Sequence, residues 1–97
     1  MKAIFLSCNQ ALYDEVLQTM QKCGITGYTG WEEVTGCGMA TGEPHLGSHA
    51  WPTMNSALLS MAENSDADKF LAEIKRIDDE NPKLGLRAFW WEIGGTI

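Results

Sequence analysis

Four residues in one irregular stretch of this chain carry side chains that bind transition metals. His45 and His49 are four positions apart, and Glu43 and Cys37 lie close to them in the sequence. Imidazole, thiolate and carboxylate groups together suit zinc, copper or nickel. These residue types predict a divalent transition-metal site. The prolines and glycines around them disfavour the helical turn that would bring both rings together, so histidines of a partner-docking loop are the competing hypothesis.

Either histidine could instead act as a general base, because imidazole titrates near neutral pH. No nucleophile stands beside such a base with an obvious third partner in the sequence. The acidic run at residues 78–80 is explained more simply as the solvated end of a helix. We therefore predict no catalytic residues, and a small dimeric enzyme remains an alternative.

Length and charge limit the possible partners. The chain has 97 residues, enough for one compact domain, residues 1–97, with one core. Its net charge is -6, and its seven basic residues are scattered, so binding to nucleic acid through the phosphates is excluded. No stretch approaches the length of a membrane span or of a signal peptide, and the three cysteines form no disulfide pattern. We expect a cytoplasmic protein without direct membrane insertion.

Hydrophobic periodicity predicts alternating strands and helices. Apolar runs with period two indicate strands, and apolar stripes with period 3.6 indicate helices. Asn9 is expected to cap the first helix, and Ser65 the second, with Asp68 completing a capping box. Gly30 is expected to mark an irregularity in the second strand. The predicted elements are a strand at 2–8, a helix within 10–24, strands at 26–34 and 56–64, a helix at 66–80 and a strand at 85–93.

This order predicts an α+β fold of the ferredoxin-like, βαββαβ type. Its four-stranded antiparallel sheet carries both helices on one face. The strands hold large side chains on both faces, and Trp90 and Trp91 must point to opposite sides. A single subunit would expose too much apolar area on the bare face, so we expect an oligomer. The small dimeric enzyme alternative would use the same fold.

The stretch GITGYTGWEEVTGCG, residues 24–38, resembles the second strand of the PII nitrogen regulatory family. In that family a Gly-(Val/Ile)-Thr-Gly-(Met/Tyr)-Thr run is followed by a valine and a Gly-x-Gly. The third predicted strand and second helix are similar to that family in pattern as well. The matching residues in this chain are Thr26, Gly27, Thr29, Val34, Gly36 and Gly38.

The resemblance implies a homotrimeric signalling protein that binds adenine nucleotides in clefts between subunits. It assigns residues 37–54 to the signalling loop of that family, the T-loop, which docks on a transporter or enzyme. Met39 stands where the family pattern has an arginine, and the glycine-rich phosphate loop is reduced to NPKLG. The ligand residues that the resemblance implies, with two cations that could replace the missing charge, are Thr29, Gly36, Cys37, Gly38, Lys83 and Arg87.

We therefore expect a PII-like regulator rather than an enzyme. It would sense a small ligand, such as an adenine nucleotide, and act on a membrane transporter through loop 37–54, where Met39 and Trp51 would contact the partner. A metal-binding accessory protein of a heavy-metal efflux pump, using His45 and His49, is the alternative.

Overall fold

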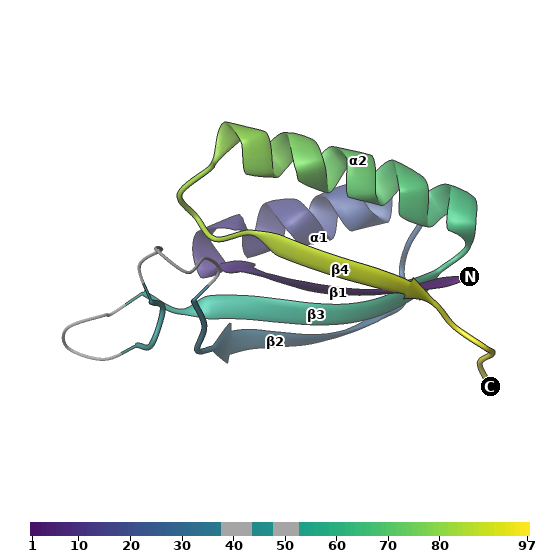
Figure 1. Cartoon of the computed structure of the whole chain (residues 1–97), viewed down its shortest axis with the longest axis horizontal. Coiled ribbons are helices and arrows are strands. Elements are labelled where there is room, and N and C mark those ends of the chain that lie inside the picture. The colour runs from purple at the N-terminus through teal and green to yellow at the C-terminus, as the bar shows by residue number, and fades with distance from the viewer. Residues whose placement is uncertain (38–43, 48–52) are drawn as a thin grey trace.

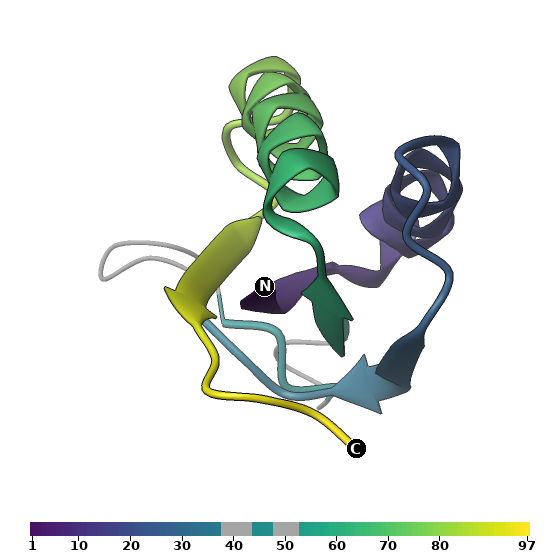
Figure 2. The ribbon, with the colours of Figure 1, turned by 90° about the vertical axis from the view of Figure 1, so that its right-hand side faces the viewer.

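The computed structural model describes residues 1–37, 44–47 and 53–97 of the chain. Four strands form one sheet in the order β2-β3-β1-β4, and every neighbouring pair is antiparallel. Helices α1 and α2 lie together on one face of this sheet (Figures 1 and 2). The predicted ferredoxin-like fold is confirmed. Its elements are β1 (Lys2–Asn9), a 3-10 turn (Gln10–Leu12), α1 (Tyr13–Lys22), β2 (Tyr28–Val34), β3 (Asn55–Ala62), α2 (Asn64–Glu80) and β4 (Arg87–Glu92).

The hydrophobic core lies between the sheet and the helices. Alternation along β1 turns Ile4, Leu6 and Cys8 towards the helices, where all three are fully buried. The apolar stripe of α2 meets them with Phe70 and Ile77, which are also fully buried. Each such aliphatic or aromatic side chain contributes about 1.5–3 kcal/mol to stability through its burial. Among the described residues, no helix is long and apolar enough to cross a lipid bilayer.

Helix α1 ends as its sequence predicts, but the cap predicted for it at Asn9 belongs to the 3-10 turn before it, and Leu12 stands at the N-cap of α1 without a side-chain hydrogen bond. The side chain of Asn9 accepts a hydrogen bond of 2.9 Å from the backbone N–H of Ala11, so it caps the short 3-10 turn that leads into the helix. At the other end Gly24 has a φ of 84°, a left-handed conformation that a glycine adopts without steric cost. The chain can therefore turn back towards β2, which begins at Tyr28.

The predicted cap of α2 is wrong. The helix starts at Asn64, and Ser65 lies inside its first turn. Glu63 alone connects β3 to α2, and its extended backbone places it at the N-cap position without a side-chain hydrogen bond. Asp68 does not complete a capping box but forms an ion pair of 2.7 Å with Lys2 on β1. A link of one residue leaves no room for the later start that Ser65 would require.

The irregularity of β2 lies further along the strand than predicted. Gly30 pairs in register with Leu58, and the register shifts only between Trp31 and Val34. Gly30 has a different role, because the hydroxyl of buried Tyr13 occupies the space that a Cβ on Gly30 would need. The absence of a side chain at Gly30 therefore allows α1 to pack closely against the sheet.

The face of the sheet opposite the helices is rich in aromatic residues. Trp31, Phe89 and Trp91 point to this face, and their exposed fractions are 45%, 58% and 48%. Trp90 points to the other face, where it lines a groove beside Leu71 of α2, as the alternation of the two tryptophans predicts. We call the uncovered side the open face. Its apolar character follows from the strand pattern together with the placement of both helices on the other side.

The buried thiol of Cys8 makes stability depend on pH. Burial raises the pKa of this thiol to about 12 from its ordinary value near 9. Above pH 9 the unfolded chain therefore releases a proton that the folded chain retains, and stability falls as pH rises. Urea denaturation between pH 9 and 10 should show a loss that is steeper in the wild type than in Cys8→Ala, by up to about 1.4 kcal/mol per pH unit.

The packing defect of Cys8→Ala is independent of pH and is measured separately at pH 7. Parallel stability curves for the two chains above pH 9 would contradict the assignment of this proton to Cys8.

Candidate functional site

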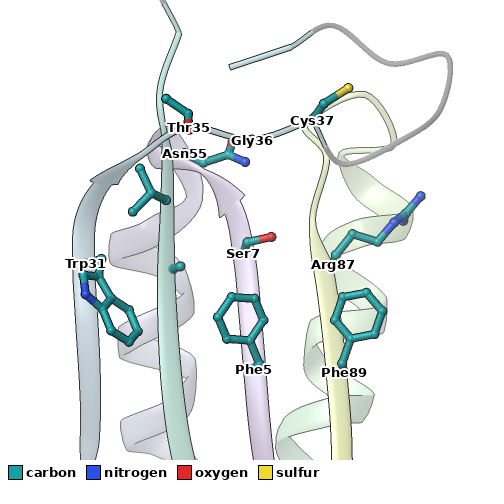
Figure 3. A pocket seen from close by; sticks show the side chains of 11 residues that line it. Phe5, Ser7, Trp31, Thr35, Gly36, Cys37, Asn55, Arg87 and Phe89 are labelled. Carbon is teal, nitrogen blue, oxygen red and sulfur yellow. The ribbon is translucent and has the colours of Figure 1, made fainter. Parts of the chain in front are cut away.

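A hollow of about 500 Å³ lies on the open face, at the end of the sheet where β2 stops and β3 starts (Figure 3). All four strands contribute to it, and the residues that follow β2 form its rim. The side chains on its floor and walls are mostly apolar. The lining residues are Phe5, Ser7, Trp31, Val34, Thr35, Gly36, Cys37, Asn55, Ala57, Arg87 and Phe89.

Strand register explains why the sheet is hollow at this point. Trp31 pairs with Ala57, Ala57 pairs with Ser7, and Ser7 pairs with Arg87, so these four residues form one row across the sheet. The two outer members of the row have long side chains and the two inner members have short ones. The neighbouring row places Phe5 beside Phe89 and closes one side. The hollow therefore results from short side chains between long ones on the surface of a continuous sheet.

The rim is held by a pairing between Gly36, just before loop 37–54, and His45 within that loop; we call this pairing the loop stem. Gly36 and His45 form an isolated antiparallel bridge with two backbone hydrogen bonds, N to O distances 2.8 and 2.5 Å. The ring of His45 is buried, with 5% of the residue exposed, and its Nδ1 is hydrogen-bonded to Oδ1 of Asn55. Because an amide oxygen only accepts, Nδ1 must carry the proton. His45 and Asn55 thus fix the strand-end geometry around Gly36.

Gly36 is required by this packing. A Cβ on Gly36 would overlap the amide nitrogen Nδ2 of Asn55, which is itself buried. Figure 3 shows the Asn55 amide and Gly36 side by side at the top of the hollow. The second glycine of the Gly-x-Gly, Gly38, lies outside the described residues.

Arg87 is the only charged residue among the described lining residues. One of its guanidinium nitrogens donates a hydrogen bond of 3.3 Å to the carbonyl of Leu86. None of the ion pairs within residues 1–37, 44–47 and 53–97 involves Arg87. An arginine has five N–H donors in a planar fork, so most of its capacity remains for a carboxylate or phosphate. The hollow combines one positive charge with aromatic walls.

The structure brings together three of the predicted ligand residues. Gly36, Cys37 and Arg87 all line the hollow. Thr29 lies on the same face of β2 but in the row beyond, opposite Leu59, and Lys83 is exposed in the turn before β4. Neither is among the described lining residues.

The four predicted metal ligands are not seen together. His45 is buried and its Nδ1 serves Asn55, while Cys37 lies at the rim of the hollow. Glu43 and His49 lie outside the described residues, as do the predicted partner residues Met39 and Trp51. No group of three metal-binding side chains occurs in the part of the chain that the structure describes. The described residues therefore give the metal hypothesis no support.

Sequence reasoning missed most of the lining residues. Ser7 and Ala57 look like ordinary strand residues, and only their register shows that they form the floor. Phe5 and Phe89 could have been placed on the open face by alternation alone, once the strand order was assumed. Asn55 gave no signal, because its role depends on the position of His45 ten residues earlier.

No protein-family model matches this chain, and no curated protein is similar to it in sequence. Solved structures are similar to it in fold. CPII from Thiomonas intermedia K12, solved with ADP, AMP and bicarbonate, has a TM-score of 0.77 and 13% identity, over 95% of this chain and 84% of CPII. The GlnK–ATP complex of B. subtilis has a TM-score of 0.72 and 20% identity, over 99% of this chain and 84% of GlnK. The chain has the PII-like fold.

A PII-like signalling protein from Thermus thermophilus shows the same similarity, with a TM-score of 0.68 and 16% identity over 95% of this chain and 85% of that protein. The PII-like fold thus extends over nearly the whole chain. It confirms, at the level of fold, the resemblance carried by the motif in residues 24–38.

The close packing of Gly36 against Asn55 predicts a large effect of one added methyl group. Gly36→Ala should lower the free energy of unfolding by about 1–3 kcal/mol, because the new Cβ must displace the buried amide. Urea denaturation measures the change. Gly27→Ala is the matched control, since a Cβ there meets no atom within 4 Å. Equal stability of the two variants would contradict the packing described for the rim.

Proposed function

We propose that this chain is a PII-like signalling protein that binds a small anionic ligand in the hollow and regulates a partner through the loop of residues 37–54. One observation carries the proposal. Gly36 and Cys37 line the hollow, and the loop begins at Cys37, directly after Gly36. A ligand in the hollow therefore contacts the base of the segment that would signal.

The chemistry of the hollow supports a ligand with a negative charge and a flat apolar part. Arg87 provides the charge-assisted hydrogen bonds that recognise a carboxylate, bicarbonate or phosphate. Trp31, Phe5 and Phe89 provide surfaces on which a ring can stack. The volume of about 500 Å³ is within the range of small-molecule sites. Adenine nucleotides have both features, and the similar CPII was solved with ADP, AMP and bicarbonate.

The open face supports a homotrimer. Contact with a neighbouring subunit would remove its exposed aromatic residues from water. The hollow is open on the side that this subunit would occupy. In such a trimer the ligand would lie in the cleft between subunits. The partner of the loop would be a membrane transporter, contacted by Met39 and Trp51, and the protein would act in the cytoplasm.

Ligand binding should depend on Arg87. Titration calorimetry with ADP, AMP, ATP and bicarbonate should detect binding by the wild-type chain. Arg87→Gln should weaken binding of the anion that binds best by at least about tenfold, because one charge-assisted hydrogen bond contributes about 1.5–3 kcal/mol. Arg76→Gln is the matched control, since this substitution removes the same positive charge from α2, away from the open face.

Two results would contradict this function. If none of the four compounds binds, the sensor proposal fails. If Arg87→Gln and Arg76→Gln weaken binding equally, the ligand does not lie in the hollow.

The oligomeric state tests the role of the open face. Light scattering should give the mass of three chains. Phe89→Glu should shift the protein towards single chains, since it places a charge among the aromatic residues of the open face, while Phe89 is already 58% exposed in one subunit and contributes little to its core. Gln18→Glu adds the same charge on the exposed side of α1 and should leave the mass unchanged. A mass of two chains for the wild type would favour the dimeric alternative.

A further inference from the structure

Asn55 occupies two structural settings at once. It is the first residue of β3, and it lines the hollow, yet only 2% of the residue is exposed. Its side chain lies between the hollow and the stem of the loop. A buried amide has one accepting oxygen and two donating N–H groups, and it costs free energy when they lack partners. The two ends of the Asn55 amide serve different neighbours.

The oxygen of this amide belongs to the loop stem. Oδ1 accepts a hydrogen bond from the Nδ1–H of His45. The backbone N–H of each of His45 and Gly36 donates to the carbonyl oxygen of the other. Asn55 thereby holds His45 in the position that closes the stem.

The nitrogen of the same amide belongs to the rim of the hollow. Nδ2 lies against Gly36, at the place where a Cβ would be, and Gly36 itself lines the hollow (Figure 3). An oxygen of a ligand in the hollow can accept from Nδ2 while Arg87 binds its charge. That hydrogen bond would orient the amide with Oδ1 towards His45.

We infer that Asn55 couples ligand binding in the hollow to the pairing of Gly36 with His45. The ligand favours the paired stem because one amide group serves both. This inference rests on the proposed function, and it adds the residue through which the signal passes to the loop. Coupling of this kind is reciprocal. If the ligand raises the equilibrium constant for pairing of Gly36 with His45 by some factor, loss of that pairing lowers the affinity for the ligand by the same factor.

Two substitutions separate the two ends of the amide. Asn55→Asp retains an oxygen for His45 and removes the Nδ2 donors. His45→Phe removes the ring N–H and retains the amide of Asn55. Asn64→Asp is the control, because it makes the same chemical change at an exposed position, the first residue of α2.

Hydrogen exchange of the Gly36 and His45 amides, with and without bicarbonate, AMP and ADP, measures the stem directly. In the wild type and in Asn64→Asp, a ligand that binds should slow both amides by at least about tenfold. In Asn55→Asp the ligand-free exchange should match the wild type, with little added protection even when the ligand is raised to saturation. In His45→Phe both amides should exchange faster without ligand, and calorimetry should show weaker binding.

The outcomes distinguish the inference from the function on which it rests. If a ligand binds the wild type and protects the stem equally in Asn55→Asp at saturation, the proposed function stands and the inference is wrong. If it binds the wild type without slowing either amide, the inference is wrong as well. Absence of binding to the wild type removes both.

Discussion

The placement of both helices on one face of the sheet is the constraint on which the rest of the structure depends. It divides each strand into residues that face the core and residues that face outwards, and these alternate except where the register shifts in β2. Cys8 and Leu6 are buried for this reason, while Trp31, Phe89 and Trp91 remain half exposed. The hollow lies on the outer side, and α1 and α2 cover the inner side.

The hollow and the loop stem are parts of one arrangement at one end of this sheet. The short side chains of Ser7 and Ala57 provide the depth, and Gly36 with His45 provides the rim. Asn55 belongs to both parts, because it stands where the chain returns from the loop into β3.

The element order, the core stripes and the open aromatic face could all be predicted from the sequence, because each depends on local periodicity. The spacing of Phe70 and Ile77 predicts the buried side of α2. The motif of residues 24–38 indicates the fold. The cap of α2 could not be predicted, because Glu63 acts through its backbone conformation and its side chain gives no signal. The floor of the hollow could not be predicted because it depends on which residues pair across neighbouring strands. The hydrogen bond between His45 and Asn55 could not be predicted because it depends on the path of the chain from the loop back to β3.

The floor of the hollow has a consequence for how such a protein can change over evolution. Ala57 and Ser7 face away from the helices, so a larger side chain at either position would reshape the hollow while the packing around Phe70 and Leu6 stayed the same. The part of the molecule that we propose to select a ligand is separated by the thickness of one sheet from the part that keeps it folded. Ligand preference can therefore diverge by single substitutions within a fold that is retained.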